Sequence, residues 1–161
     1  MRVPRRILVP TDLSELSLEA LGYAEEISRL FNAEIIILHV IESKDASEFP
    51  VKSRLEEAEF EARKSVIHLL MDHAIVPRNL RLELCHGSAV EEIIRSVGQC
   101  HADIVVMSTH GRTGLRHILM GSVAEQVVRL SPVPVLTIKG DGPDENVELR
   151  KEEIKVNLHL N

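Results

Sequence analysis

The chain has 161 residues, of which 44% are hydrophobic and only 2% aromatic, and its formal net charge at pH 7 is -6. This length suits one globular domain, which buries about two-thirds of the surface that its unfolded chain exposes. The acidic balance and the scarcity of aromatic rings argue against a nucleic-acid-binding surface, because such a surface needs basic side chains and rings on which bases can stack.

The hydrophobic pattern predicts strands that alternate with helices. Short aliphatic runs predict the strands, and apolar residues at helical spacing predict the helices between them. Two prolines near the end of this pattern, Pro132 and Pro134, favour an edge position for the last strand. In chain order we expect a strand at 6–10, a helix at 16–31, a strand at 34–40, a helix at 55–69, a strand at 80–85, a helix at 90–97, a strand at 103–107, a helix at 123–128 and a strand at 131–138.

This alternation predicts an α/β fold, with an open parallel sheet of five strands and helices on both of its faces. In such folds, ligands bind outside the carboxyl ends of the strands, at the point where the direction of winding reverses. We therefore expect the functional site at the ends of strands rather than on the outer faces of helices.

The carboxyl-terminal residues have a different composition. Glycine, proline and acidic residues cluster in 140–148, as in a linker, whereas apolar and polar residues alternate in 154–161, as in a half-buried strand. We expect a domain over 1–140, followed over 141–161 by a linker and a C-terminal strand. That strand would pair with an edge of its own sheet or of a partner subunit, so it is a candidate dimer-forming segment.

The amino-terminal residues are basic, but the apolar run at 7–9 is too short for a signal peptide or a membrane span. The two cysteines, Cys85 and Cys100, lie in or beside apolar segments, so we expect buried thiols rather than a disulfide framework. Both observations favour a cytoplasmic protein without a membrane partner.

The stretch from Met107 to Ala124, M-S-T-H-G-R-T-G-L-R-H-I-L-M-G-S-V-A, places glycines and cations between a strand and a helix. Glycine lets the backbone approach a ligand closely, and the helix that opens at Gly121 and Ser122 directs N–H groups and its positive dipole end outward. The stretch therefore predicts an anion site, with phosphate as the expected anion. The residues expected to form the turn that faces it are Ser108, Thr109, His110, Gly111, Arg112 and Gly114.

Two residues near these strand ends allow both a functional and a structural interpretation. Asp12 follows the first strand, where its carboxylate could bind ribose hydroxyls or a phosphate-bound cation. Alternatively, Asp12 caps the following helix in a capping box with Glu15, or Ser14 caps that helix instead. Ser122 is equally suited to cap a helix and to bind a terminal phosphate, and both roles can hold together.

Other motifs are absent or point to structural roles. The sequence has neither a G-x-x-x-x-G-K-[ST] loop nor a G-x-G-x-x-G fingerprint after a strand, and no Ser-His-acid set can be assembled. Cys85 and His86 are adjacent on a strand, so they point to opposite faces and do not share a metal. His39 is expected to be a packed or hydrogen-bonded core residue.

Four segments resemble the universal stress protein family, and the resemblance spans residues 4–139. They are V-P-T-D-L-S in the first strand, L-H-V at the end of the second, H-G-S-A-V-E-E-I after the third, and G-S-V-A-E-Q-V-V in the last helix. In the nucleotide-binding branch of this family the loop reads G-x2-G-x9-G-[ST]. Gly111, Gly121 and Ser122 match that pattern, whereas Ser108 stands in place of the first glycine.

The resemblance implies an ATP-binding α/β protein that is usually dimeric, with sheet order 3-2-1-4-5. It also implies ATP or another adenine nucleotide as the ligand, with Mg²⁺ as a candidate companion, adenine and ribose near the first two strands, and phosphates at the loop. Matched position by position, the nucleotide-binding residues would be Pro10, Thr11, Asp12, Val40, Met107, Ser108, His110, Gly111, Arg112, Gly121, Ser122 and Val123.

The leading hypothesis is an adenine-nucleotide-binding regulator of the stress response that is non-catalytic or barely catalytic. One alternative is a slow ATPase or phosphate-transferring enzyme, in which Asp12 orients a cation and Arg112 or His110 neutralises developing charge. A second alternative, favoured by Ser108, is a nucleotide-free dimeric interaction module. A flavodoxin-like flavin carrier ranks last, because few aromatic residues are present to stack on the flavin ring.

Overall fold

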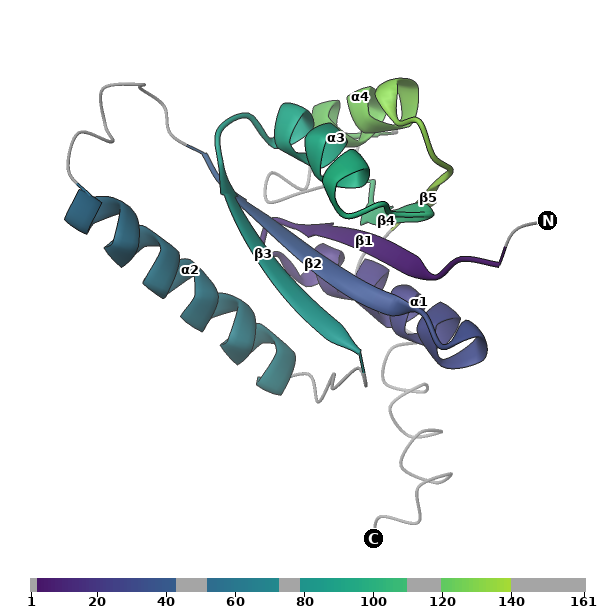
Figure 1. The fold of residues 1–161 in the computed structure, drawn as a ribbon, viewed down its shortest axis with the longest axis horizontal. Helices are drawn as coiled ribbons and strands as arrows, with labels where there is room; N and C mark the ends of the chain where they lie inside the picture. Colours follow the sequence, from purple (N-terminus) through teal and green to yellow (C-terminus); the bar gives the residue numbers. More distant parts are fainter. Residues whose placement is uncertain (1–2, 43–51, 73–78, 110–119, 140–161) are drawn as a thin grey trace, which may run out of the picture.

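A computed structural model describes residues 3–42, 52–72, 79–109 and 120–139, and within them the strands form one parallel sheet in the order β3-β2-β1-β4-β5 (Figure 1). The expected fold class, the sheet order and the edge position of the last strand are thus confirmed. The strands are β1 (Arg6–Thr11), β2 (Glu34–Ile41), β3 (Leu80–His86), β4 (Ile104–Ser108) and β5 (Val135–Ile138). The helices are α1 (Glu15–Phe31), α2 (Lys52–Asp72), α3 (Ala89–Gln99) and α4 (Ser122–Leu130).

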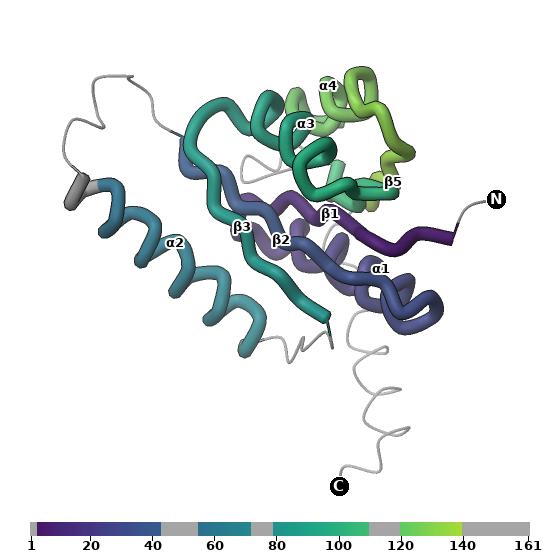
Figure 2. Tube along the Cα trace, in the orientation of Figure 1, coloured from purple at the N-terminus to yellow at the C-terminus, as the bar shows by residue number. Residues whose placement is uncertain are grey.

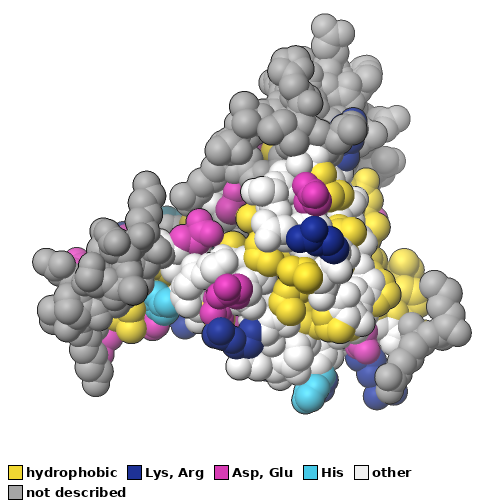
Figure 3. Space-filling model, turned by 90° about the horizontal axis from the view of Figure 1, so that it is seen from above, with side chains coloured by type: hydrophobic (Ala, Val, Ile, Leu, Met, Phe, Trp, Pro, Cys, Tyr) yellow, Lys and Arg dark blue, Asp and Glu magenta, His cyan; other side chains and the backbone are white. Residues whose placement is uncertain are grey.

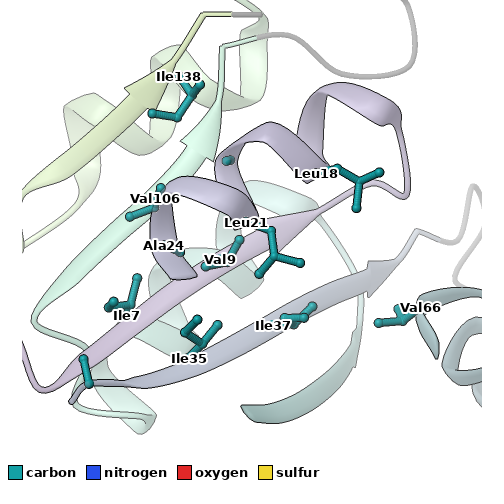
Figure 4. Packing of buried hydrophobic residues seen from close by; sticks show 12 residues of the cluster. Ile7, Val9, Leu18, Leu21, Ala24, Ile35, Ile37, Val66, Val106 and Ile138 are labelled. Carbon is teal, nitrogen blue, oxygen red and sulfur yellow. The ribbon is translucent and has the colours of Figure 1, made fainter. Parts of the chain in front are cut away.

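The central strands are nearly continuous aliphatic runs because both faces of the sheet are covered. Ile7 and Val9 of β1 pack in the layer beneath α1 and α2, and Leu8 between them packs in the layer beneath α3 and α4. Figure 4 shows the first of these layers, where Leu21 of α1 and Val66 of α2 lie over the strands. Each fully buried aliphatic side chain stabilises the fold by about 1.5–3 kcal/mol.

The course of the chain defines one point at which the winding reverses. From β1 the chain moves outward through β2 to β3, and it then returns to the other side of β1 to form β4 and β5 (Figure 2). Helices α1 and α2 cover one face, and α3 and α4 cover the other (Figure 1). The connections after β1 and β4 therefore leave toward opposite faces from neighbouring strand ends, which is where ligands bind in this class of fold.

The opposite end of the sheet is fastened by Asp103, directly before β4. Its Oδ2 atom accepts hydrogen bonds from the backbone N–H groups of Arg5, at 2.8 Å, and Arg6, at 3.0 Å. Its own backbone N–H donates to the carbonyl of Arg6 at 2.9 Å. Strand β4 begins one residue after the predicted start, and Asp103 ties that start to β1.

Figure 3 looks onto the face formed by α3 and α4, where hydrophobic side chains lie among scattered charged ones. Within the described residues, no helix is both long enough and apolar enough to cross a membrane. The predicted linker and strand over 141–161, and with them the proposed domain boundary, lie outside the described residues.

Candidate functional site

The turn from β1 to α1 is a compact network of hydroxyl and carboxylate groups. Thr11 Oγ1 accepts the backbone N–H of Leu13 at 3.1 Å and shares a hydrogen bond of 2.7 Å with Ser17 Oγ. Leu13 adopts φ of +66°, a conformation that is uncommon outside glycine, so this network holds a strained turn. Its rigidity fixes where the carboxylate of Asp12 lies.

The structure shows which of two residues, Asp12 or Ser14, caps helix α1. Ser14 is the N-cap of α1, and its side chain accepts the backbone N–H of Ser17. The capping role considered for Asp12 is therefore wrong. Instead, Asp12 Oδ1 accepts hydrogen bonds from the backbone N–H of Ser14 at 3.1 Å and from Ser14 Oγ at 2.6 Å. Asp12 orients the cap residue while its side chain remains partly exposed at the strand end.

The end of β4 is joined to the start of α4. Thr109, the residue after β4, donates its backbone N–H to the carbonyl of Ile138 at 2.8 Å and accepts the N–H of Gly121 at 2.7 Å. The two ends of the glycine-containing loop are thus held together at the carboxyl end of β4. The loop residues His110, Gly111, Arg112 and Gly114 lie outside the described residues.

Helix α4 begins with a cap that has no side chain. Gly121 is the N-cap, with φ of -69° and ψ of 154°, and a residue of any type can adopt this conformation. Glycine is therefore not needed at position 121 for the shape of the backbone. The backbone N–H groups of Ser122 and Val123, in the first turn of α4, have no acceptor within the helix.

Ser108, which departs from the family pattern, is the last residue of β4 and pairs with Ile138 of β5. Among the described residues it is not one of those with positive φ. Its extended backbone does not require glycine, so serine fits this position without strain. Met107 before it is 6% exposed and packs in the core, which leaves only its backbone for ligand contacts.

On the other side of β1, the end of β2 supplies Val40. His39 beside it bonds through Nδ1 to the carbonyl of Thr11 at 2.9 Å. Because a carbonyl oxygen can only accept, Nδ1 carries the proton, and His39 ties the end of β2 to the β1–α1 turn. His39 is hydrogen-bonded as predicted, although it is half-buried and not part of the core. The structure therefore brings nine of the predicted site residues to the carboxyl ends of the strands, here called the carboxyl edge of the sheet. They are Pro10, Thr11, Asp12, Val40, Met107, Ser108, Gly121, Ser122 and Val123.

Neither cysteine has the properties of a nucleophile. Burial raises the pKa of the half-buried Cys85 thiol. Burial and a hydrogen bond from Cys100 Sγ to Glu83 Oε2, at 3.1 Å, raise the pKa of Cys100 to about 11. Both thiols are therefore protonated at neutral pH, and of the two only Cys100 is fully buried as expected. Cys85 and His86 face opposite sides of the sheet, since His86 Nε2 bonds to Glu59 of α2 at 3.0 Å.

Taken over the described ranges, no three His, Cys, Asp or Glu side chains come together in a group that could hold a metal ion. The hydroxyl residues around Asp12 are a sequence signal for a hydrogen-bonded β1–α1 turn. The individual hydrogen bonds of that turn could not be predicted from the sequence. The close packing around Gly87, after β3, was also missed, although the tripeptide H-G-S at a strand end is a turn signal.

The sheet order defines a doubly wound α/β protein, and its candidate site has a glycine-capped helix beside the point where the winding reverses. Residues 4–139 match the model of the universal stress protein family, so the chain belongs to that family. Universal stress protein MJ0531 from Methanocaldococcus jannaschii is 33% identical over 142 residues, which cover 84% of this chain and 82% of that protein. Universal stress protein MJ0577 from the same organism is 31% identical over 156 residues, with 84% and 94% covered.

Solved structures agree with this assignment. The structure of MJ0577, described as a structure-based assignment of biochemical function, superposes with a TM-score of 0.74 at 30% identity, covering 88% of this chain and 99% of that one. A universal stress protein in complex with cAMP has a TM-score of 0.59 at 24% identity, covering 87% of this chain and 100% of that one. At that identity the likeness concerns the fold alone.

Proposed function

We propose that this chain is an adenine-nucleotide-binding regulator of the stress response whose site is non-catalytic or barely catalytic. The observation that carries the proposal is the bond between Gly121 and Thr109, which fixes the glycine-capped end of α4 at the end of β4, next to the strand that the Asp12 turn follows. The backbone N–H groups and positive end of α4 follow one strand, and a carboxylate follows the neighbouring strand. This polarity suits the phosphates and the ribose of one nucleotide.

Each part of the nucleotide has a group to receive it. The amides of Ser122 and Val123, with the Ser122 hydroxyl, would bind phosphate oxygens at the helix end. Asp12 would accept hydrogen bonds from ribose hydroxyls, and its carboxylate also suits a phosphate-bound Mg²⁺. The backbone of Val40 would meet adenine, as the family resemblance implies. The loop residues His110, Gly111 and Arg112 would complete the phosphate side.

The described residues support binding more than catalysis. The hydroxyls of Thr11, Ser14 and Ser17 hydrogen-bond to one another or to the turn, and both thiols are protonated. An activated nucleophile needs a neighbouring base or a depressed pKa. Neither thiol has a depressed pKa, and the carboxylate beside the Ser14 hydroxyl, that of Asp12, also accepts the Ser14 backbone N–H and so holds the cap of α1. A bound nucleotide would then act by stabilising one state of the protein.

We also propose that the protein works as a cytoplasmic homodimer. Among the described residues β5 is the outer strand, and the carbonyls of Pro134 and Ile138 point inward to β4, which directs the backbone groups of Val135 and Thr137 outward for pairing. Leu130 and Leu136 nearby are 52% and 37% exposed, and a partner would cover them.

The test is to denature protein purified without added nucleotide and to identify any released small molecule by mass spectrometry. We expect an adenine nucleotide. We also expect ATP with Mg²⁺ to raise the melting temperature, because a ligand that binds only the folded state stabilises it. No co-purified nucleotide and no shift at millimolar ATP would instead support the nucleotide-free interaction module.

Phosphate release separates the regulator from an enzyme. A non-catalytic regulator should release no phosphate from ATP above background, and a barely catalytic one should release it only slowly. Turnover that disappears in Asp12→Ala, while ATP affinity survives, would favour the slow ATPase.

A further inference from the structure

The turn from β3 to α3 lies at the same edge as the end of β2 (Figure 1). Gly87, in this turn, has φ of +138°, an angle that residues other than glycine rarely adopt. Its backbone N–H donates to the carbonyl of Ile41 at 3.3 Å. The turn is therefore bonded to the residue that follows Val40.

Glu92 of α3 packs directly against this turn. It is 6% exposed, and a Cβ atom at position 87 would lie 3.2 Å from Glu92 Oε1 and 3.5 Å from Glu92 Cγ. The backbone N–H of Glu92 also bonds to the carbonyl of Ser88 at 3.0 Å. That backbone bond is the first i→i−4 bond of α3, so Glu92 contacts the turn itself through its side chain, which packs against Gly87.

The charge of Glu92 is matched within its own helix. Arg95 Nη1 lies 2.6 Å from Glu92 Oε1, and the Arg95 side chain is 57% exposed. A buried carboxylate costs free energy through lost hydration, and such a pair is often no more stabilising than an apolar residue of the same size. Stability alone therefore gives little reason for an acid at this position.

We propose that Glu92, held by Arg95, is a positioning residue for the base end of the nucleotide site. It holds Gly87 in place, Gly87 holds Ile41, and the Val40 backbone is thereby fixed for reading the base. Adenine offers an N–H₂ donor where guanine offers a carbonyl acceptor, so a fixed backbone discriminates between them. This inference rests on the proposed nucleotide binding, which it deepens by assigning base selectivity to one residue pair.

The first test needs no nucleotide. In Glu92→Ala, amide hydrogen exchange at Gly87 should accelerate at least tenfold, whereas exchange at Val105 in the sheet centre should not change. Glu92→Gln, which keeps the size and a hydrogen-bond acceptor, should restore slow exchange. Glu91→Ala is the matched control, since Glu91 is the exposed neighbour in the same turn of α3. Unchanged Gly87 exchange in Glu92→Ala would refute the positioning role, whatever the protein binds.

The second test compares the dissociation constants of ATP and GTP by calorimetry. We expect the wild type and Glu92→Gln to prefer ATP, and Glu92→Ala to lose about tenfold in ATP affinity with GTP affinity unchanged. Equal losses for both nucleotides would indicate general damage and overturn the inference, as would a wild type without preference. A wild type with slow Gly87 exchange that binds neither nucleotide would instead refute the proposed function and leave the packing role intact.

Discussion

Replacing Gly121 by valine separates the binding role of the α4 cap from its structural role. The backbone angles of Gly121, φ of -69° and ψ of 154°, lie in the extended region that β-branched residues favour. Its N–H bond to Thr109 is kept in the variant. The exchange therefore adds an isopropyl group at the helix end on a backbone conformation that valine adopts readily.

The effect on stability should be small. Valine is a poorer N-cap than glycine by about 1 kcal/mol, and the loss of glycine flexibility in the unfolded chain returns about 0.4–1 kcal/mol. These terms nearly cancel, so the melting temperature without ligand should change by no more than about 4 °C. The same side chain would occupy the space of a phosphate, and the affinity for ATP should fall at least a hundredfold, or about 2.7 kcal/mol.

Differential scanning fluorimetry without nucleotide and calorimetry with ATP and Mg²⁺ measure the two effects. Gly98→Val serves as the control, because a Cβ at that position meets no atom within 4 Å. Gly98 also lies near the end of α3, away from the carboxyl ends of the strands. Undiminished ATP binding by Gly121→Val would refute the placement of the phosphates. A large loss of unliganded stability would refute the argument from the backbone angles.

Three further predictions concern stability and assembly. Asp103→Ala removes two hydrogen bonds between a carboxylate and backbone amides, and it should lower the free energy of unfolding by about 2 kcal/mol in urea denaturation; a loss below about 0.5 kcal/mol would contradict this fastening role. Because the folded-state pKa of Cys100, about 11, lies above its ordinary value of 9.0, the neutral thiol contributes stability below pH 9 that is lost as pH rises through 11. Denaturation curves of Cys100→Ala across that range should lack this loss, and equal pH dependence in both proteins would count against it. Deleting residues 147–161 should weaken oligomerisation, and unchanged sedimentation would refute a role for the C-terminal segment.

The fold was predictable from sequence because its strongest signals are repeated. Aliphatic runs such as that of β2 and the helical spacing in α1 each mark one element, and a parallel sheet needs that alternation. The strand order required more, since periodicity does not say which strands are neighbours, and it came from the family resemblance. The confirmed edge position of β5 followed from its prolines alone.

The candidate site was predictable in position and less so in detail. Asp12 and Ser14 have the same preference for helix caps, so spacing could not decide which of them caps α1. The choice depends on backbone geometry, because the positive φ of Leu13 places Ser14 at the cap and turns Asp12 toward it. The contact of Glu92 with Gly87 depends on how α3 packs over β3, which no local pattern encodes.

The bond between Thr109 and Gly121 also affects how much the amino-acid sequence between these two residues can vary. With both anchor points fixed by the sheet and by α4, the intervening segment is closed at its base whatever its sequence. Doubling the length of such a closed segment costs only about 0.6 kcal/mol of chain entropy. Because the closing bond joins two backbone groups, it does not depend on the side chain at either residue, and the sequence between the two anchors can vary while the end of β4 and the start of α4 stay joined.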